Sequence, residues 1–156
     1  MQSIRPAVKA DIPRILALLV QVDMVHHRIR PDLFNGPATK YSEAELEAIL
    51  ADETTPVFVF PDEDGRVLGY AFCILKEQHG PLLTDLKTLY IDDLCVDEAA
   101  RGRHVGTALY EYVCEYARTL GCYNVTLNVW EGNDAARQFY EKMGMTPRKT
   151  MMECKL

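Results

Sequence analysis

The chain has 156 residues, of which 48% are hydrophobic and 26% are charged, as is usual for a soluble globular protein with one sizeable core. Its formal net charge of −6 argues against nucleic acid as the main partner and mildly favours a cationic substrate. The 5 cysteines are scattered, and neither a signal peptide nor a membrane-spanning run is present, which predicts a cytoplasmic protein with reduced thiols.

The first third of the chain predicts a short strand and two helices. A strand is expected over residues 3–6, followed by a helix in which Asp11 is a good N-cap and Pro13 fits the first turn. The apolar stripe of this helix is Ile12, Ile15, Leu16, Leu19 and Val22. Loop-forming residues are frequent from 23 to 40, and the capping box at 42–45 predicts a second helix.

Runs of β-forming residues, with apolar–polar alternation at 123–130, predict the strands of a sheet. The expected strands cover residues 56–60, 67–75, 85–96, 123–130 and 146–156. Two more helices are expected, from Val105 to Leu120 and from Asn133 to Met143, each followed by a glycine that suits a helix end. Residues 1–156 therefore predict a single α/β (α+β) domain, with a mostly antiparallel sheet and helices on both of its faces.

A basic, glycine-containing loop connects the strand 85–96 to the next helix. It contains Arg101, Gly102, Arg103, His104, Val105, Gly106 and Thr107. Free N–H groups and the dipole at a helix start suit a phosphate or pyrophosphate, and glycines let the backbone approach such a ligand. The alternative is a well-capped helix with its arginines in solvent. The spacing matches neither a P-loop nor a dinucleotide fingerprint.

A second motif lies in the helix 133–143, where Asn133, Ala136 and Tyr140 share one face over two turns. With the basic loop, it resembles the GNAT superfamily of N-acetyltransferases, whose signatures read roughly Arg/Gln-x-x-Gly-x-Gly/Ala and Asn-x-x-Ala-x-x-x-Tyr. The similarity is strongest from Asp92 to Met145. It implies a sheet of six to seven strands with about four helices, and acetyl-CoA as a co-substrate bound by the loop and by the residues of the second motif.

His104 departs from the family's pattern, because the family most often has its first loop glycine at this place. A positive φ at a histidine would cost about 1 kcal/mol or more. We expect right-handed helical geometry at His104 instead, with its side chain pointing away or donating to a phosphate.

The resemblance also implies roles in acetyl transfer. The family places a tyrosine at the position of Tyr140 as general acid for the departing thiolate, whereas the alternative is a tyrosine that only packs. Backbone N–H groups of Leu94, Cys95 and Val96 are expected to bind the pantetheine arm and to polarise the acetyl carbonyl. A covalent acetyl-Cys95 intermediate is the alternative at that position.

The acceptor amine has to lose a proton, and Asp92 and Asp93 are the candidate bases. Adjacent strand residues point to opposite faces, so only one of them should face the acceptor unless the strand has a bulge. Asp92 maps onto the first carboxylate of the Glu-Asp-Leu run of polyamine and diamine acetyltransferases, which lies in the acceptor site. His26 and His27 are candidates for the acceptor wall and for a proton relay, or are ordinary surface residues. No residues have metal-ligand spacing, so no metal is expected.

These residues predict an acetyl-CoA-dependent N-acetyltransferase that acts on a small cationic amine by direct attack in a ternary complex. One alternative acceptor is a protein or peptide amine. The other alternative is a catalytically idle acyl-CoA-binding module, which is favoured by His104 and by Asn128, where some family members have a glutamate. No nucleic-acid or membrane partner is expected, and the resemblance leaves a homodimer open.

Overall fold

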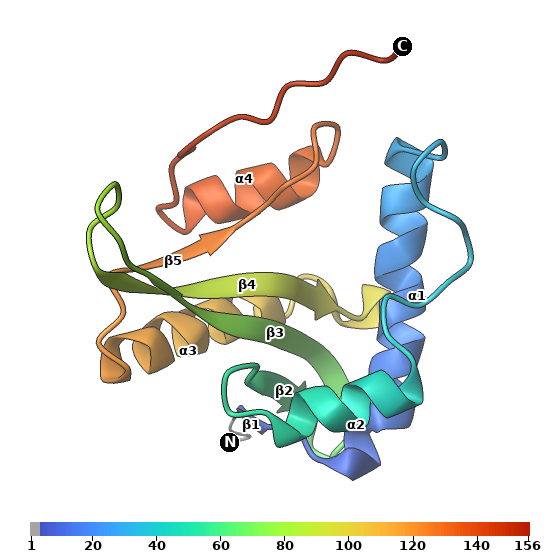
Figure 1. Ribbon diagram of the computed structural model, residues 1–156. Coiled ribbons are helices and arrows are strands. Elements are labelled where there is room, and N and C mark those ends of the chain that lie inside the picture. Colours follow the sequence, from blue (N-terminus) through green and yellow to red (C-terminus); the bar gives the residue numbers. More distant parts are fainter. Residues whose placement is uncertain (1–3) are drawn as a thin grey trace.

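The computed structural model describes residues 4–156, so residue 3 of the expected first strand lies outside the described residues. The elements are β1 (Arg5–Pro6), η1 (Lys9–Asp11), α1 (Ile12–Ile29), α2 (Glu43–Ala51), β2 (Val57–Pro61), β3 (Val67–Gln78), β4 (Leu86–Val96), η2 (Glu98–Ala100), α3 (Val105–Thr119), β5 (Asn124–Leu127) and α4 (Asp134–Lys142) (Figure 1). Within residues 4–156, no helix combines the length and the apolar character needed to cross a membrane.

The strands form one mixed sheet in the order β1-β2-β3-β4-β5. The pairs from β1 to β4 are antiparallel, whereas β5 runs parallel to β4. This confirms a mostly antiparallel sheet, but the part of the chain that the structure describes has five strands rather than six to seven. The expected strand 146–156 is an extended, exposed tail outside the sheet, and β5 ends at Leu127 rather than at Trp130 (Figure 1).

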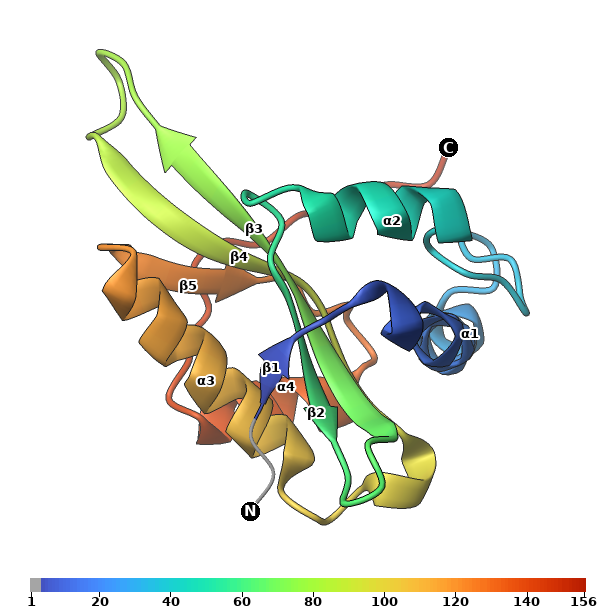
Figure 2. The ribbon, with the colours of Figure 1, turned by 90° about the horizontal axis from the view of Figure 1, so that it is seen from below.

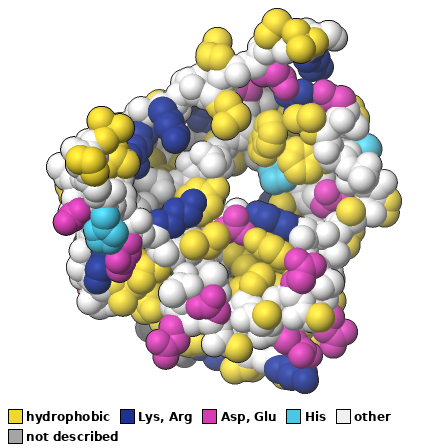
Figure 3. Space-filling model, viewed as in Figure 1, with side chains coloured by type: hydrophobic (Ala, Val, Ile, Leu, Met, Phe, Trp, Pro, Cys, Tyr) yellow, Lys and Arg dark blue, Asp and Glu magenta, His cyan; other side chains and the backbone are white. Residues whose placement is uncertain are grey.

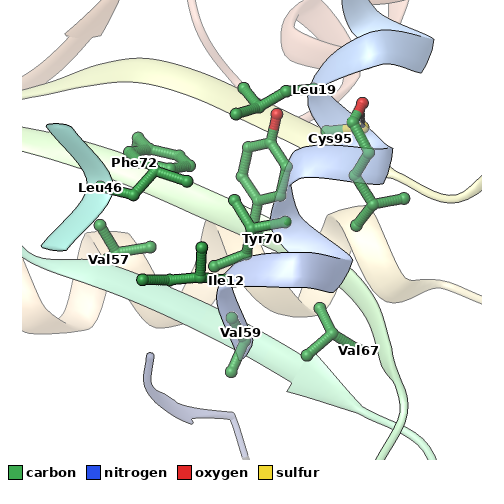
Figure 4. Close-up of a cluster of buried hydrophobic side chains, with 11 residues drawn as sticks. Ile12, Leu19, Leu46, Val57, Val59, Val67, Tyr70, Phe72 and Cys95 are labelled. Atoms are coloured by element: carbon green, nitrogen blue, oxygen red, sulfur yellow. Dashed lines mark hydrogen bonds between the residues drawn. The ribbon is translucent and has the colours of Figure 1, made fainter. Parts of the chain in front are cut away.

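Helices cover both faces of the sheet, as expected: α1 and α2 lie on one face and α3 on the other (Figure 2). Two buried clusters result, because successive strand residues point to opposite faces. In β2, for example, Val57 and Val59 belong to the cluster under α1 and α2, whereas Phe58 belongs to the cluster under α3. Figure 4 shows the first cluster, with Tyr70 standing between Phe72 and Cys95.

Of the two predicted N-caps, Ser42 is confirmed and Asp11 is not. Ser42 caps α2 as expected, because its hydroxyl accepts the N–H of Glu45 at 3.2 Å while the Glu45 carboxylate accepts the N–H of Ser42. Asp11 precedes α1 but makes no side-chain cap there. Its carboxylate instead accepts the N–H of Val8 at 2.8 Å and forms an ion pair with Arg5 at 2.8 Å. The charge of Arg5 therefore draws this carboxylate toward β1.

Candidate active site

The candidate site begins where β4 and β5 separate. Their pairing runs from Thr88–Asn124 to Ile91–Leu127, and beyond Ile91 strand β4 continues to Val96 beside β3 alone. Backbone groups of residues 92–96 that point toward β5 therefore have no strand partner. Figure 3 shows an opening in this part of the molecule, between α1, α4 and β4, with charged and histidine side chains at its edge.

A bulge in β4 turns both aspartates to the same side of the sheet. Ile91 pairs with Cys73 and Asp93 pairs with Phe72, so Asp92 is an extra residue on β4. Asp92 contacts Tyr41 and Asp93 contacts Tyr70. Tyr41 and Tyr70 both belong to the α1 and α2 side. In a regular strand, Asp92 and Asp93 would point to opposite faces of the sheet. Because of the bulge, both point to the same face.

Asp93 is a carboxylate whose environment makes it a base near neutral pH. The hydroxyl of Tyr70 donates to its Oδ2 at 2.7 Å, and Tyr70 itself is fully buried. Burial and the neighbouring charge of Asp92 raise the pKa of Asp93 to about 6, against the opposing effects of the Tyr70 hydrogen bond and the charge of Lys40. A carboxylate with such a pKa is ionised at pH 7 and still a fair proton acceptor.

Asp92 is already held by two groups from the connection between α1 and α2. The hydroxyl of Tyr41 donates to Oδ2 of Asp92 at 2.5 Å, and Nζ of Lys40 lies 2.9 Å from the same oxygen. Burial and the charge of Asp92 raise the pKa of Tyr41. Lys40, Tyr41 and Tyr70 were not predicted from the sequence. They lie 23 or more positions from the aspartates that they contact, and no spacing or motif links them to Asp92 or Asp93.

The basic loop enters α3 through a residue in left-handed geometry. His104 has φ 61° and ψ 18°, so the expected right-handed geometry is wrong. The chain has to turn sharply from η2 into α3, and His104 makes this turn at the place where the family most often has glycine. The His104 side chain makes no capping hydrogen bond. Residues 101–104 are all exposed, and the first N–H groups of α3 lack intrahelical partners, as at every helix start.

Gly106 faces α4, and Asn133 caps that helix. A Cβ on Gly106 would lie 3.4 Å from the Phe139 ring, an ordinary van der Waals distance. The Oδ1 atom of Asn133 accepts the N–H of Ala136 at 3.3 Å and caps α4. The Asn-x-x-Ala pattern is thus the cap of the helix that carries Tyr140.

Tyr140 is half-buried on α4, and its ring lies 6.3 Å from that of Tyr110. Burial raises the pKa of Tyr140, and the charge of Asp93 raises it further. The phenol is therefore protonated at neutral pH and is able to donate its proton. Because the charge of Asp93 raises the pKa of Tyr140, the two side chains lie within electrostatic reach of each other.

Cys95 has the environment of a core thiol rather than of a nucleophile. It is 5% exposed, and its Sγ donates weakly to the carbonyl oxygen of Leu18 at 3.7 Å. Burial raises the pKa of Cys95 to about 12, which keeps the reactive thiolate scarce. This environment disfavours a covalent acetyl-Cys95 intermediate. Residues 4–156 also contain no cluster of three His, Cys, Asp or Glu side chains able to hold a metal ion.

Aromatic side chains, which we call the aromatic wall, connect the C-terminal end of α1 to the segment after β5. The ring of Phe34 lies 5.0 Å from His26 and 5.3 Å from Trp130, which follows β5. His27 fixes the backbone at Phe34, because its Nδ1 forms a hydrogen bond with the carbonyl oxygen of Phe34 at 2.7 Å. Burial and the charge of Lys40 lower the pKa of His26, so its imidazole is neutral at pH 7. His26 and His27 were predicted from the sequence, whereas Phe34 and Trp130 were not, because only the folded chain brings these two rings together.

Comparison with known proteins agrees with this geometry. A sequence model of the acetyltransferase (GNAT) family matches residues 22–145. Glucosamine 6-phosphate N-acetyltransferase 1 of Oryza sativa subsp. japonica is 35% identical over 150 residues, which are 96% of this chain and 84% of that protein. The Trypanosoma brucei brucei glucosamine 6-phosphate N-acetyltransferase is 36% identical over 94 residues, and this match covers only 59% of either chain.

A solved structure extends the likeness to the whole chain. The crystal structure of a mutant of the BH1408 protein from Bacillus halodurans has a TM-score of 0.95 and 32% identity, and the match covers 99% of both chains. The family match spans the gap, the basic loop and α4 together. The chain therefore belongs to the acetyltransferase (GNAT) family.

Proposed function

We propose that this enzyme transfers the acetyl group of acetyl-CoA to the primary amine of a small molecule, by direct attack within a ternary complex. The observation that supports the proposal is the separation of β4 from β5 beyond Ile91, which leaves backbone groups next to Asp93 without a strand partner. The charge of Asp93 also raises the pKa of Tyr140. Amine acetylation by a thioester needs a base, a proton donor and donors to the carbonyl oxygen. We assign these three tasks to Asp93, to Tyr140 and to the backbone N–H groups of residues 94–96, respectively.

The basic loop supports a cofactor with a diphosphate. Arg101 and Arg103 are exposed on either side of Gly102, directly before the N-terminus of α3. A helix N-terminus with adjacent guanidinium groups binds phosphate oxygens through N–H groups and charge. We assign to this loop the diphosphate of acetyl-CoA, with Asn133, Ala136 and Tyr140 on the other side of the pantetheine arm.

In the proposed reaction, Asp93 accepts a proton from the acceptor ammonium. This step matters because deprotonating an amine with a pKa near 10.4 at pH 7 requires roughly 4–5 kcal/mol. Backbone N–H groups of Leu94 to Val96 that face the gap stabilise the carbonyl oxygen as it becomes negative. Tyr140 gives its proton to the departing thiolate, so that CoA leaves as a thiol.

The acceptor we favour is a small molecule with a primary amine that is cationic at neutral pH. Asp92 and Asp93 attract an ammonium group, and the aromatic wall of Phe34 and Trp130 offers an apolar surface beside it. Two curated relatives are named for glucosamine 6-phosphate, an amino sugar that also carries a phosphate. Glucosamine 6-phosphate is therefore the first acceptor to test, followed by spermidine, diamines and peptides.

The test begins with binding and continues with turnover. We expect calorimetry to show micromolar binding of acetyl-CoA and none of acetyl-pantetheine, since the latter lacks the phosphates. Release of free CoA thiol is then measured with each acceptor. The absence of acetyl-CoA binding at millimolar concentration would contradict the proposed co-substrate, and binding without turnover of any amine would indicate an idle acyl-CoA-binding module.

Tyr140→Phe tests the proton donor. The variant should fold normally and lose about a hundredfold in kcat, the usual effect of removing a general acid. Tyr110→Phe is the matched control, because this neighbouring phenol lies 6.3 Å from Tyr140 between ring centroids and has no assigned role. An unchanged kcat of Tyr140→Phe with every acceptor would remove Tyr140 from the mechanism.

A further inference from the structure

The proposed acceptor side of the gap contains a primary amine that belongs to the protein itself. Nζ of Lys40 lies 2.9 Å from Oδ2 of Asp92 and 3.5 Å from the backbone carbonyl oxygen of the same residue. Asp92 is the bulged residue of β4, directly before the candidate base Asp93. The ammonium group of Lys40 is thus held at the point of β4 where an acceptor ammonium would be expected.

Electrostatic effects agree with this position of Lys40 near the catalytic candidates. Its charge lowers the pKa of Asp93 on β4 and that of His26 on α1. The charge of Asp93 in turn raises the pKa of Tyr140 on α4. Lys40 therefore lies within electrostatic reach of Asp93, and Asp93 lies within electrostatic reach of Tyr140. Lys40 is also 46% exposed, so its side chain is not locked in the core.

We propose that Lys40 is an internal acceptor, and that the enzyme acetylates its own Lys40 when acetyl-CoA is bound and no external amine fills the gap. This inference rests on the proposed function, because it uses the same co-substrate and the same catalytic groups. It adds a modification site in the connection between α1 and α2.

The reaction balances with acetyl-CoA as the sole co-reactant. The Lys40 ammonium gives one proton to Asp93, which passes it to water. The free Nζ attacks the thioester carbonyl carbon, the N–C bond forms and the C–S bond breaks. The thiolate takes the proton of Tyr140, and the second amine proton restores the phenol. The products are acetyl-lysine at position 40, CoA thiol and one proton in solution.

Lys9 provides a matched control within the same chain. It is also paired with a carboxylate, since its Nζ lies 3.2 Å from Glu47, but it sits on η1 and is 78% exposed. Acetyl-CoA that reacts without catalysis should modify the more exposed Lys9 at least as fast as Lys40. Faster acetylation of Lys40 therefore reports catalysis at the gap.

The experiment incubates the full chain with acetyl-CoA carrying a deuterated acetyl group, without any added amine. Peptides from a chymotrypsin digest are then quantified by mass spectrometry over time. Lys40 should gain the label at least about tenfold faster than Lys9, because a held amine has a high effective concentration. The rate per molecule should not depend on protein concentration, and Tyr140→Phe should slow the labelling of Lys40 but not that of Lys9.

Separate readouts distinguish failure of this inference from failure of the proposed function. Calorimetry with acetyl-CoA and CoA release with glucosamine 6-phosphate and spermidine are measured on the same preparation. Turnover of an external amine with Lys40 labelled no faster than Lys9 would overturn the inference alone. A labelling rate that rises with protein concentration would overturn the internal step, and absent acetyl-CoA binding would overturn the function as well. Lys40→Arg should abolish the label at position 40.

Discussion

Asp93 illustrates how much a single residue depends on its surroundings. The sequence singled out two adjacent aspartates as candidate bases but offered no ground to assign different strengths to them. In the structure, Asp92 forms an ion pair with Lys40, whereas burial raises the pKa of Asp93 to about 6. The hydrogen bond from Tyr70 opposes this rise. We therefore favour Asp93 over Asp92 as the base.

A pH profile tests this assignment. The base works in its ionised form, so kcat/KM should fall as the pH is lowered through about 6, the pKa of Asp93. Tyr70→Phe removes a hydrogen bond that favours the carboxylate, so it should raise this pKa and move the acid limb to higher pH. Tyr41→Phe is the control, because Tyr41 bonds to Asp92. An acid limb that stays in place in Tyr70→Phe would contradict the role of Asp93.

His104 carries a local strain that glycine would relieve. A left-handed residue with a Cβ costs about 1–2 kcal/mol, so His104→Gly should raise the free energy of unfolding by about 0.5–1 kcal/mol after the entropy cost of glycine. Urea unfolding gives this difference, and calorimetry shows whether acetyl-CoA still binds. His104→Ala keeps the Cβ and should bring no gain. Lower stability of the glycine variant would mean that the imidazole itself stabilises the loop.

At the scale of elements, the position of α3 depends on a glycine in β3. A Cβ on Gly69 would lie 2.8 Å from the carbonyl oxygen of Cys95 and 3.0 Å from the side chain of Val105. Gly69 therefore lets the first turn of α3 sit directly on the sheet, beside the end of β4. Both segments carry proposed cofactor contacts, so this packing also affects the site.

Gly69→Ala should destabilise the protein by about 1–3 kcal/mol, as overpacking of a tight contact does. The backbone oxygen of Cys95 cannot move aside without shifting β4, so acetyl-CoA binding should weaken as well. Thermal unfolding and calorimetry measure the two effects. Gly106→Ala is the comparison for stability alone, since its Cβ would meet atoms no nearer than 3.4 Å but the residue belongs to the proposed cofactor loop. Equal stability of the Gly69 variant and the parent protein would show that the sheet absorbs the extra methyl group.

At the scale of the whole molecule, the C-terminal tail and the edge of the sheet remain exposed. Met151, Met152 and Leu156 are 97%, 85% and 120% exposed, respectively. Strand β5 is an edge strand, paired only with β4. Exposed apolar side chains and open strand edges favour association with another chain. A homodimer, which the family resemblance left open, stays a prediction. We expect the C-terminal tail to form the contact between its two protomers.

Light scattering tests this prediction. The full chain should have twice the mass of one protomer, whereas a variant that ends at Thr150 should shift toward the monomer. The truncated variant should still fold, because none of the removed side chains belongs to either buried cluster. A monomeric full chain, or a dimer that is unchanged by the truncation, would contradict the tail as the contact.

The sequence by itself determined the family, the fold class and the position of most elements. Local patterns carry this information: the apolar stripe of α1, the capping box of α2, the β-forming runs of β2 and β3, and the two motifs around α3 and α4. Local patterns also misled. The composition of residues 146–156 suits a strand, but in the structure they pair with no strand, although the outer edge of β5 is open.

Only the tertiary structure decided which residues meet at the gap. The bulge at Asp92 arises from the register between β3 and β4, which no local pattern encodes. Lys40, Tyr70 and Trp130 reach the gap from three separate parts of the chain. Their importance lies in distances and shared burial, and these exist only after long-range pairing and packing have formed. The pKa of Asp93 follows from the same packing, because burial is its main cause.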